Sequence, residues 1–301
     1  MNPILKCLIG LAAWLVVQPA LAALNIFACE PEWGALAKEL AGDKANIYVA
    51  TTALQDPHRI EARPSLIARA RTADLVVCTG ADLEIGWMPL VQTQSGNSRI
   101  QAGRPGYFEA ARQLTLIEIP QQLDRSLGDV HAAGNPHVHL DPSNIATVAA
   151  ALAERMVQLD PGETVHYRAR ARSFSERWQL AQARWEKEGA PLKGMPIVVY
   201  HRNISYLVHW LGMREVGALE PKPGLPPTAT HLSELLATLG HDPAKAVVRA
   251  AYNEPRAAEW LSERAKIPAV TLPFTVGGSE RANDLFGLFD DTLSRLLTAA
   301  K

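Results

Sequence analysis

Short, almost wholly apolar segments alternate with helical patterns on both sides of one long charged stretch, and this alternation leaves few folds open to the chain. Strands covered by helices on both faces read as continuous apolar runs, as they do in parallel sheets. The chain therefore belongs to the α/β class. Such strands are predicted over 24–29, 45–49, 73–78, 195–200, 246–250 and 269–272.

The charged stretch between the two groups of strands is helical in pattern. It runs from Pro142 to about Gly189 and is broken once, at Asp160-Pro161-Gly162. A long helix with a polar majority often bridges two lobes rather than filling a core. Ligands of α/β sheets bind beyond the C-terminal strand ends, which here means the cleft between lobes. We predict an N-terminal lobe (23–160), a linking helix (161–190) and a C-terminal lobe (191–301), both lobes being doubly wound.

The first 22 residues have the pattern of an export signal. Lys6 supplies a positive start, an apolar run follows from Cys7 to Val17, and Ala20-Leu21-Ala22 matches a cleavage site. A membrane anchor is the alternative, but the run is shorter than the about 20 residues that a span needs. We predict cleavage after Ala22 and export of the mature protein to a bacterial periplasm.

Removal of the signal would leave two cysteines, Cys29 and Cys78, each at the end of a predicted strand. An oxidising compartment favours a disulfide between them, provided that the strands are neighbours. Two buried free thiols are the alternative. A cysteine-based metal site is disfavoured because the C-x-x-C spacing is missing.

The charge balance excludes one class of partner. The chain has 30 Lys and Arg against 31 Asp and Glu, a formal net charge of -1. Binding to nucleic acid needs a basic surface that neutralises phosphates. We therefore expect no nucleic-acid partner.

Several of the nine histidines lie in loops or directly after strands. Imidazole suits zinc, whereas manganese prefers more oxygen ligands. His137 and His139 would share one face of an extended chain. A hydrogen-bonded structural role is the alternative for any single histidine. The residues that stand out are His58, His131, His137, His139 and His201.

Four motifs, in this order and at these spacings, resemble the metal-binding class of periplasmic solute-binding proteins that serve zinc and manganese ABC importers. The resemblance covers essentially all of the predicted mature chain. It implies two α/β lobes joined by one long rigid helix, with the metal between them. The motifs are Asp56-Pro57-His58 with Arg63-Pro64-Ser65, Ala73–Val77 running into Gly80–Glu84, Asn135–Pro142, and Tyr200-His201 with Tyr206 and Leu211-Gly212.

The same resemblance implies the metal ligands. The three histidines of the family's site match His58, His137 and His201. Many relatives add a carboxylate after a strand near the C-terminus, but the matching stretch here, 272–278, contains none. The alternatives for a fourth ligand are His139 or water and, less favoured, Glu254 or Asp284. His139 is itself a departure, since relatives usually have an aromatic residue there.

His131 lies in a segment that is longer and rich in histidine in zinc-specific relatives. It could pass zinc to the site as an accessory residue, or could be an ordinary surface histidine. Ligating histidines usually donate their second N–H to a carboxylate or carbonyl. Three carboxylates near the ligands or strand ends in sequence could accept such a hydrogen bond: Asp56, Glu84 and Asp141. Asp141 is better explained as the N-cap of the following helix.

These observations predict a binding protein rather than an enzyme. It would act as a monomer that captures Zn²⁺ in the periplasm and delivers it to the membrane permease of a metal ABC importer. A zinc-dependent hydrolase is an alternative, but no H-E-x-x-H motif is present and Glu254 is the best available base. A manganese or iron carrier is another alternative. It is disfavoured because 272–278 lacks the carboxylate ligand that these ions prefer.

Overall fold

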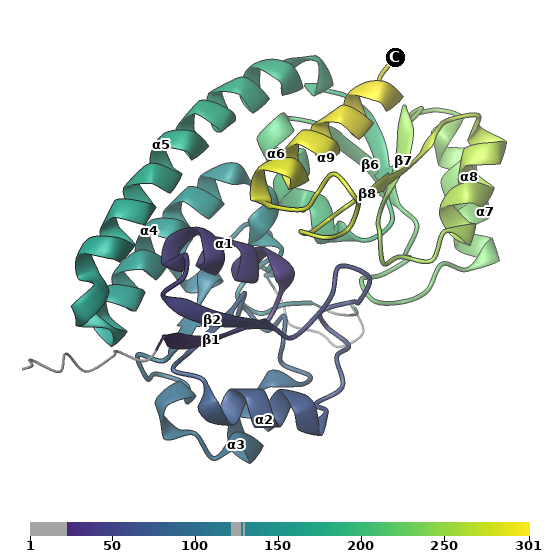
Figure 1. The fold of residues 1–301 in the computed structure, drawn as a ribbon. Helices are drawn as coiled ribbons and strands as arrows, with labels where there is room; N and C mark the ends of the chain where they lie inside the picture. Colours follow the sequence, from purple (N-terminus) through teal and green to yellow (C-terminus); the bar gives the residue numbers. More distant parts are fainter. Residues whose placement is uncertain (1–22, 122–127, 129) are drawn as a thin grey trace, which may run out of the picture.

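Each half of the chain builds its own four-stranded parallel sheet (Figure 1). The computed structural model describes residues 23–121, 128 and 130–301. The strand orders are β2-β1-β3-β4 in the first lobe and β6-β5-β7-β8 in the second. The strands are β1 (Leu24–Ala28), β2 (Ala45–Val49), β3 (Leu75–Cys78), β4 (Tyr107–Glu109), β5 (Pro196–Val199), β6 (Arg214–Ala218), β7 (Ala246–Ala250) and β8 (Ala269–Leu272).

Helices cover both sheets, as the apolar strands predicted. Proline stands at the first position of the helices that begin at 31, 64 and 142, where its missing N–H costs nothing. Gly42 ends the first of these with φ of 62°, which glycine adopts easily. The α-helices are α1 (Pro31–Ala41), α2 (Pro64–Thr72), α3 (Met88–Ser95), α4 (Pro142–Leu159), α5 (Thr164–Gly189), α6 (Ser205–Leu211), α7 (Ala229–Leu239), α8 (Arg256–Ala265) and α9 (Leu285–Ala299).

The predicted two-lobed architecture with a long linking helix is confirmed. Helix α5 runs along one side of the molecule from the first lobe to the second (Figure 1). The helix bridges the lobes as expected, and it also contributes to the core through a stripe of buried aromatic residues, Tyr167, Phe174, Trp178 and Trp185. Trp178 donates to the carbonyl of Pro142 at 2.8 Å, and Trp185 stacks on Phe289 of α9. The stripe therefore joins α5 to both lobes.

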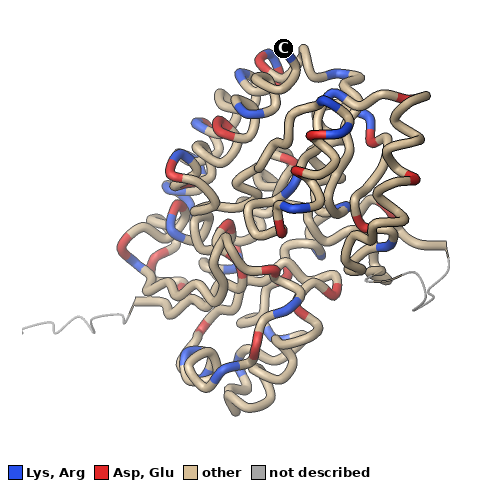
Figure 2. The backbone as a smooth tube through the Cα atoms, turned by 90° about the vertical axis from the view of Figure 1, so that its right-hand side faces the viewer, with Lys and Arg blue, Asp and Glu red and all other residues tan. Residues whose placement is uncertain are grey.

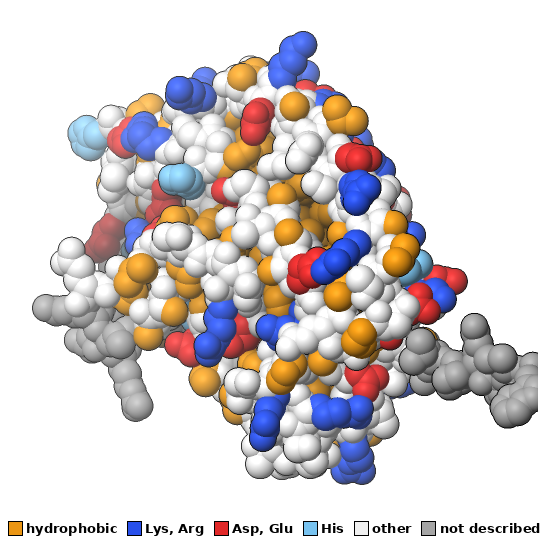
Figure 3. Space-filling view, turned by 90° about the vertical axis from the view of Figure 1, so that its left-hand side faces the viewer, with side chains coloured by type: hydrophobic (Ala, Val, Ile, Leu, Met, Phe, Trp, Pro, Cys, Tyr) orange, Lys and Arg blue, Asp and Glu red, His pale blue; other side chains and the backbone are white. Residues whose placement is uncertain are grey.

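Charged residues of both signs are spread over the molecule (Figure 2). The face on the α5 side carries them among scattered apolar side chains (Figure 3). Among the residues described, no helix has the length and hydrophobicity needed to cross a membrane. The predicted export signal, 1–22, lies outside those residues.

The sequence patterns missed α3, β4, β6 and α7. Strands β4 and β6 lie at sheet edges, where one side faces solvent and the residues are more polar. Strand β6 carries Arg214 and Glu215, and it is only half buried along its length. An apolar run is therefore absent where the structure has a strand. This omission matters, because the end of β6 contributes to the site described below.

The structure joins Cys29 and Cys78 in a disulfide, as the sequence favoured. The two residues follow or end neighbouring parallel strands, and their Cα atoms are 4.8 Å apart. That separation lies within the usual range for such a bond. The bond closes a loop of 49 residues and so restricts the unfolded chain.

Replacing both cysteines by alanine is expected to lower the free energy of unfolding by roughly 2–4 kcal/mol. Both side chains are fully buried, so the double variant avoids a lone thiol in the core. Urea denaturation of the metal-free proteins measures the difference. Equal midpoints for the variant and the oxidised wild type would contradict the prediction.

Two buried carboxyl groups lie beside this disulfide. Glu84 accepts hydrogen bonds from the backbone N–H groups of Thr79 and Gly80, and Glu30 accepts from Thr79. Burial raises the pKa of Glu30 well above its usual range, and the neighbouring Glu84 raises it further. Burial also raises the pKa of Glu84 to about 7. The folded state therefore retains a proton that the unfolded chain loses above about pH 4.5.

Because of this retained proton, the contribution of the pair to stability is full below about pH 4.5 and is lost as the pH rises through the raised pKa values of the two carboxyl groups. Glu30→Gln supplies an amide N–H in place of the proton. The difference in Tm, variant minus wild type, should rise by roughly 5 °C between pH 5 and pH 8. Calorimetry of the metal-free proteins in chelator tests this, and a constant difference would refute it.

Candidate functional site

Three histidines from separate segments meet between the lobes. His58 lies in the loop after β2, His137 directly precedes the 3-10 turn η4 (Val138–Leu140), and His201 is the second residue after β5. One ring nitrogen from each lies within 4.8 Å of the others. The structure thus brings together the three residues that the resemblance implied as ligands. We refer to them as the histidine cluster.

Each ring in the histidine cluster is held through its Nδ1 atom. His58 Nδ1 lies 2.7 Å from a carboxylate oxygen of Asp56, and His201 Nδ1 lies 2.7 Å from a carboxylate oxygen of Glu220. His137 Nδ1 lies 2.9 Å from the side-chain oxygen of Asn135. These acceptors require a proton on each Nδ1, so that each Nε2 offers a lone pair. This is the arrangement in which imidazoles bind metal ions.

His137 is the most enclosed member of the histidine cluster. Its side chain is 2% exposed, and its Nε2 atom is buried without a hydrogen-bond partner. Burial lowers the pKa of His137 well below its usual value, and the neighbouring rings of His58 and His201 lower it further. The ring is therefore neutral at pH 7, with a buried lone pair that a cation would satisfy.

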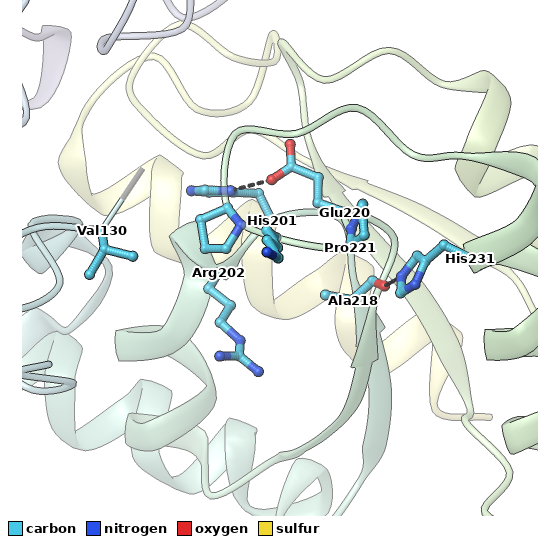
Figure 4. A pocket seen from close by; sticks show the side chains of 9 residues that line it. Val130, His201, Arg202, Ala218, Glu220, Pro221 and His231 are labelled. Carbon is cyan, nitrogen blue, oxygen red and sulfur yellow. Dashed lines mark hydrogen bonds and ion pairs between the residues drawn. The ribbon is translucent and has the colours of Figure 1, made fainter. Parts of the chain in front are cut away.

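The histidine cluster is open to solvent through two adjoining pockets. One has a volume of about 250 Å³ and is lined by residues of both halves of the chain, including His131, His137 and His201. The other, of about 410 Å³, is lined by His201, Glu220 and His231 (Figure 4). Both pockets include His201, so a small ion can reach its ring from outside. His231 donates a hydrogen bond from Nε2 to the Ala218 carbonyl at 2.9 Å.

His131 approaches the histidine cluster closely. Its Nε2 lies 3.2 Å from His58 Nε2. The centres of its ring and of the His58 ring are 5.2 Å apart, and its ring centre is 6.3 Å from that of His137. His131 is therefore part of the cleft wall beside the cluster, near the site that it was expected to serve as a possible accessory residue.

His139 takes part in a different buried group, which joins the two lobes. Its Nε2 donates to the Phe274 carbonyl at 2.9 Å, and its Nδ1 lies 3.2 Å from Glu32, without the alignment of a hydrogen bond. Glu32 also accepts from the Thr275 hydroxyl at 2.5 Å. Phe274 has a positive φ of 66°, unusual for a bulky residue. We call His139, Glu32, Phe274 and Thr275 the interlobe group.

The other residues singled out in the sequence lie elsewhere. Glu254 is exposed and lies 3.5 Å from Arg256. Asp284 accepts from the Gly287 N–H and caps α9. Asp141 accepts from the Ser143 N–H and caps α4, as predicted. Within the described residues, none of these carboxylates belongs to the histidine cluster.

Two partners of the histidine cluster, Asn135 and Glu220, were not predicted. Asn135 lies two residues before His137, a spacing at which a side-chain oxygen can reach Nδ1. Glu220 follows β6, the neighbour of β5 in the sheet. Recognition of β6 as an edge strand would have placed its end beside His201.

Comparisons with known proteins agree with this architecture. The family described as "Zinc-uptake complex component A periplasmic" matches residues 26–299. A crystal structure of ZnuA superposes with a TM-score of 0.75 at 18% identity, covering 93% of this chain and 100% of that one. The laminin-binding adhesin Lmb of Streptococcus agalactiae gives 0.76 at 19% identity, covering 93% and 100%. At these identities the two structures show the shared fold.

Similarities in sequence are more distant. The manganese ABC transporter substrate-binding lipoprotein scaA of Streptococcus gordonii is 25% identical over 154 residues, 51% of this chain and 47% of that protein. The high-affinity zinc uptake system protein ZnuA of Brucella abortus is 26% identical over 121 residues, 40% and 35% of the two chains. These matches span half or less of the relatives' length. Taken with the fold and the family match over residues 26–299, they lead to one conclusion: the chain belongs to the zinc-uptake complex component A family of periplasmic metal-binding proteins that serve ABC importers.

Proposed function

We propose that this protein captures Zn²⁺ in the periplasm and delivers it to the permease of a metal ABC importer, acting as a monomer without catalytic turnover. His58, His137 and His201 bind the ion through Nε2. The observation that carries the proposal is the convergence of three Nε2 lone pairs, each oriented by a hydrogen bond at Nδ1. Neutral imidazoles are the donors that zinc favours.

The choice of zinc over manganese rests on the chemistry of these donors. Relatives carry names with either metal. Manganese prefers oxygen ligands, and no carboxylate among the described residues joins the histidine cluster. Asp56 and Glu220 instead accept hydrogen bonds from the Nδ1 atoms of His58 and His201. These hydrogen bonds raise the basicity of the two rings as metal ligands.

A metal titration of the mature, metal-stripped protein tests this function. We expect one tightly bound zinc per chain by elemental analysis, with manganese unable to displace it. Absence of zinc binding, or a preference for manganese, would overturn the proposal. Hydrolytic turnover that depends on zinc and is lost in Glu254→Gln would favour an enzyme instead.

The carboxylates behind the rings give a second prediction. Asp56→Asn and Glu220→Gln preserve size but remove the charge that orients and strengthens His58 and His201. Each is expected to lower zinc affinity by roughly 10- to 100-fold. Competition with a chromophoric chelator measures the change. Asp242→Asn, which alters an exposed ion pair with Arg214, is the control; equal affinities in all three variants would contradict the orienting role.

A further inference from the structure

His131 has an unusual relation to His58. The Nε2 atoms of the two rings are only 3.2 Å apart. His58 Nδ1 faces the Asp56 carboxylate at 2.7 Å and therefore carries a proton, which leaves a lone pair on His58 Nε2. That lone pair points at the Nε2 of His131. Two ring nitrogens at this distance need a proton or a cation that both can share.

The separation of these nitrogens matches a zinc site. Zn–N distances of about 2.0–2.1 Å in a tetrahedron place two ligating nitrogens about 3.3 Å apart, and their ring centres about 5.2 Å apart. The ring centres of His58 and His131 are 5.2 Å apart. Those of His58 and His137 are 5.3 Å apart, and those of His137 and His201 are 5.8 Å apart.

Two further distances between ring centres, like that of His137 and His201, are longer than a tetrahedron requires. His58 and His201 have ring centres 6.0 Å apart, and His131 and His137 have theirs 6.3 Å apart. Shifts on the order of 1 Å would bring these rings to tetrahedral spacing. The pockets beside His131, His137 and His201 leave room for such shifts. The rings of His58, His137 and His201 thus approach one point, and His131 lies beside it, against His58.

We propose that His131 is the fourth ligand, so that the protein holds Zn²⁺ through four imidazoles. This inference rests on the proposed function and adds the residue that completes the site. His139 is unsuited to that place, since its Nε2 is engaged by the Phe274 carbonyl and its Nδ1 faces Glu32. A site of four neutral nitrogens discriminates against manganese more strongly than one completed by water or a carboxylate.

The test combines zinc K-edge X-ray absorption with chelator competition on the wild type, on His131→Ala and on His241→Ala. His241 is exposed just after α7 and serves as the control. We expect four imidazole nitrogens around zinc in the wild type and in the control. His131→Ala should keep one zinc per chain, lose a quarter of the imidazole scattering and bind zinc 10- to 100-fold more weakly.

The outcomes separate this inference from the proposed function. A wild-type spectrum with three imidazoles and one oxygen, or an unchanged affinity and spectrum in His131→Ala, would overturn the role of His131 while leaving zinc capture by the other three histidines intact. Failure of the wild type to bind zinc tightly would overturn both. The wild-type spectrum decides the ligand count even if the variant folds poorly.

Discussion

Replacing His137 by alanine is expected to reduce the affinity for zinc by about two to three orders of magnitude. The free energy of zinc binding to a structural site of about four ligands is roughly 10–16 kcal/mol, so that one ligand contributes about 2.5–4 kcal/mol. His137 is the most buried member of the histidine cluster, and its Nε2 atom has no hydrogen-bond partner in the protein. Water that replaced the ring would be a weaker ligand in this enclosed position.

The measurement is zinc affinity by chelator competition, at a pH where the wild type is saturated. His58→Ala and His201→Ala are expected to weaken binding to a similar extent, because their rings approach the same point. His209→Ala, an exposed substitution on α6, is the matched control and should bind as the wild type does. Unchanged affinity in the three cluster variants would refute the ligand assignment.

The second large effect concerns stability rather than binding. Glu32→Ala is expected to lower the free energy of unfolding by about 3–5 kcal/mol, as removal of one partner from a buried charged group does. Glu32 is 2% exposed and contacts both His139 and the Thr275 hydroxyl. Its loss would leave the buried Thr275 hydroxyl without its acceptor and the His139 ring without the facing carboxylate, at the junction of the two lobes.

Urea denaturation of the metal-free protein measures this effect. Glu39→Ala on the same helix is the control, since the ion pair of Glu39 with Arg177 is partly exposed. Exposed pairs contribute about 1 kcal/mol or less. If the two variants lost equal stability, the interlobe group would have no special part in holding the lobes together. A lower cooperativity of unfolding in Glu32→Ala alone would show that the lobes separate first.

The accuracy of the sequence prediction varied with burial. Strands β7 and β8 were predicted with their exact limits because most of their residues are apolar, although β8 lies at a sheet edge as β6 does. Edge strand β6 was missed because it begins with Arg214 and Glu215 and contains Gly217, so that no apolar run marks it. Because β6 was missed, Glu220, the partner of His201, was missed as well. Helix capping was predicted correctly because it depends on residues close together in the sequence, as with Asp141 at the start of α4.

Sequence alone determined the α/β class, the two lobes, the long connecting helix and the short list of histidines from which a site could be built. It did so because burial periodicity and turn chemistry are local properties of a chain. Only the tertiary structure decided that His139 faces Glu32 and Phe274, and that His131 lies 3.2 Å from His58. Residues 73 positions apart in the sequence become neighbours through the packing of separate segments, and no local pattern records that distance.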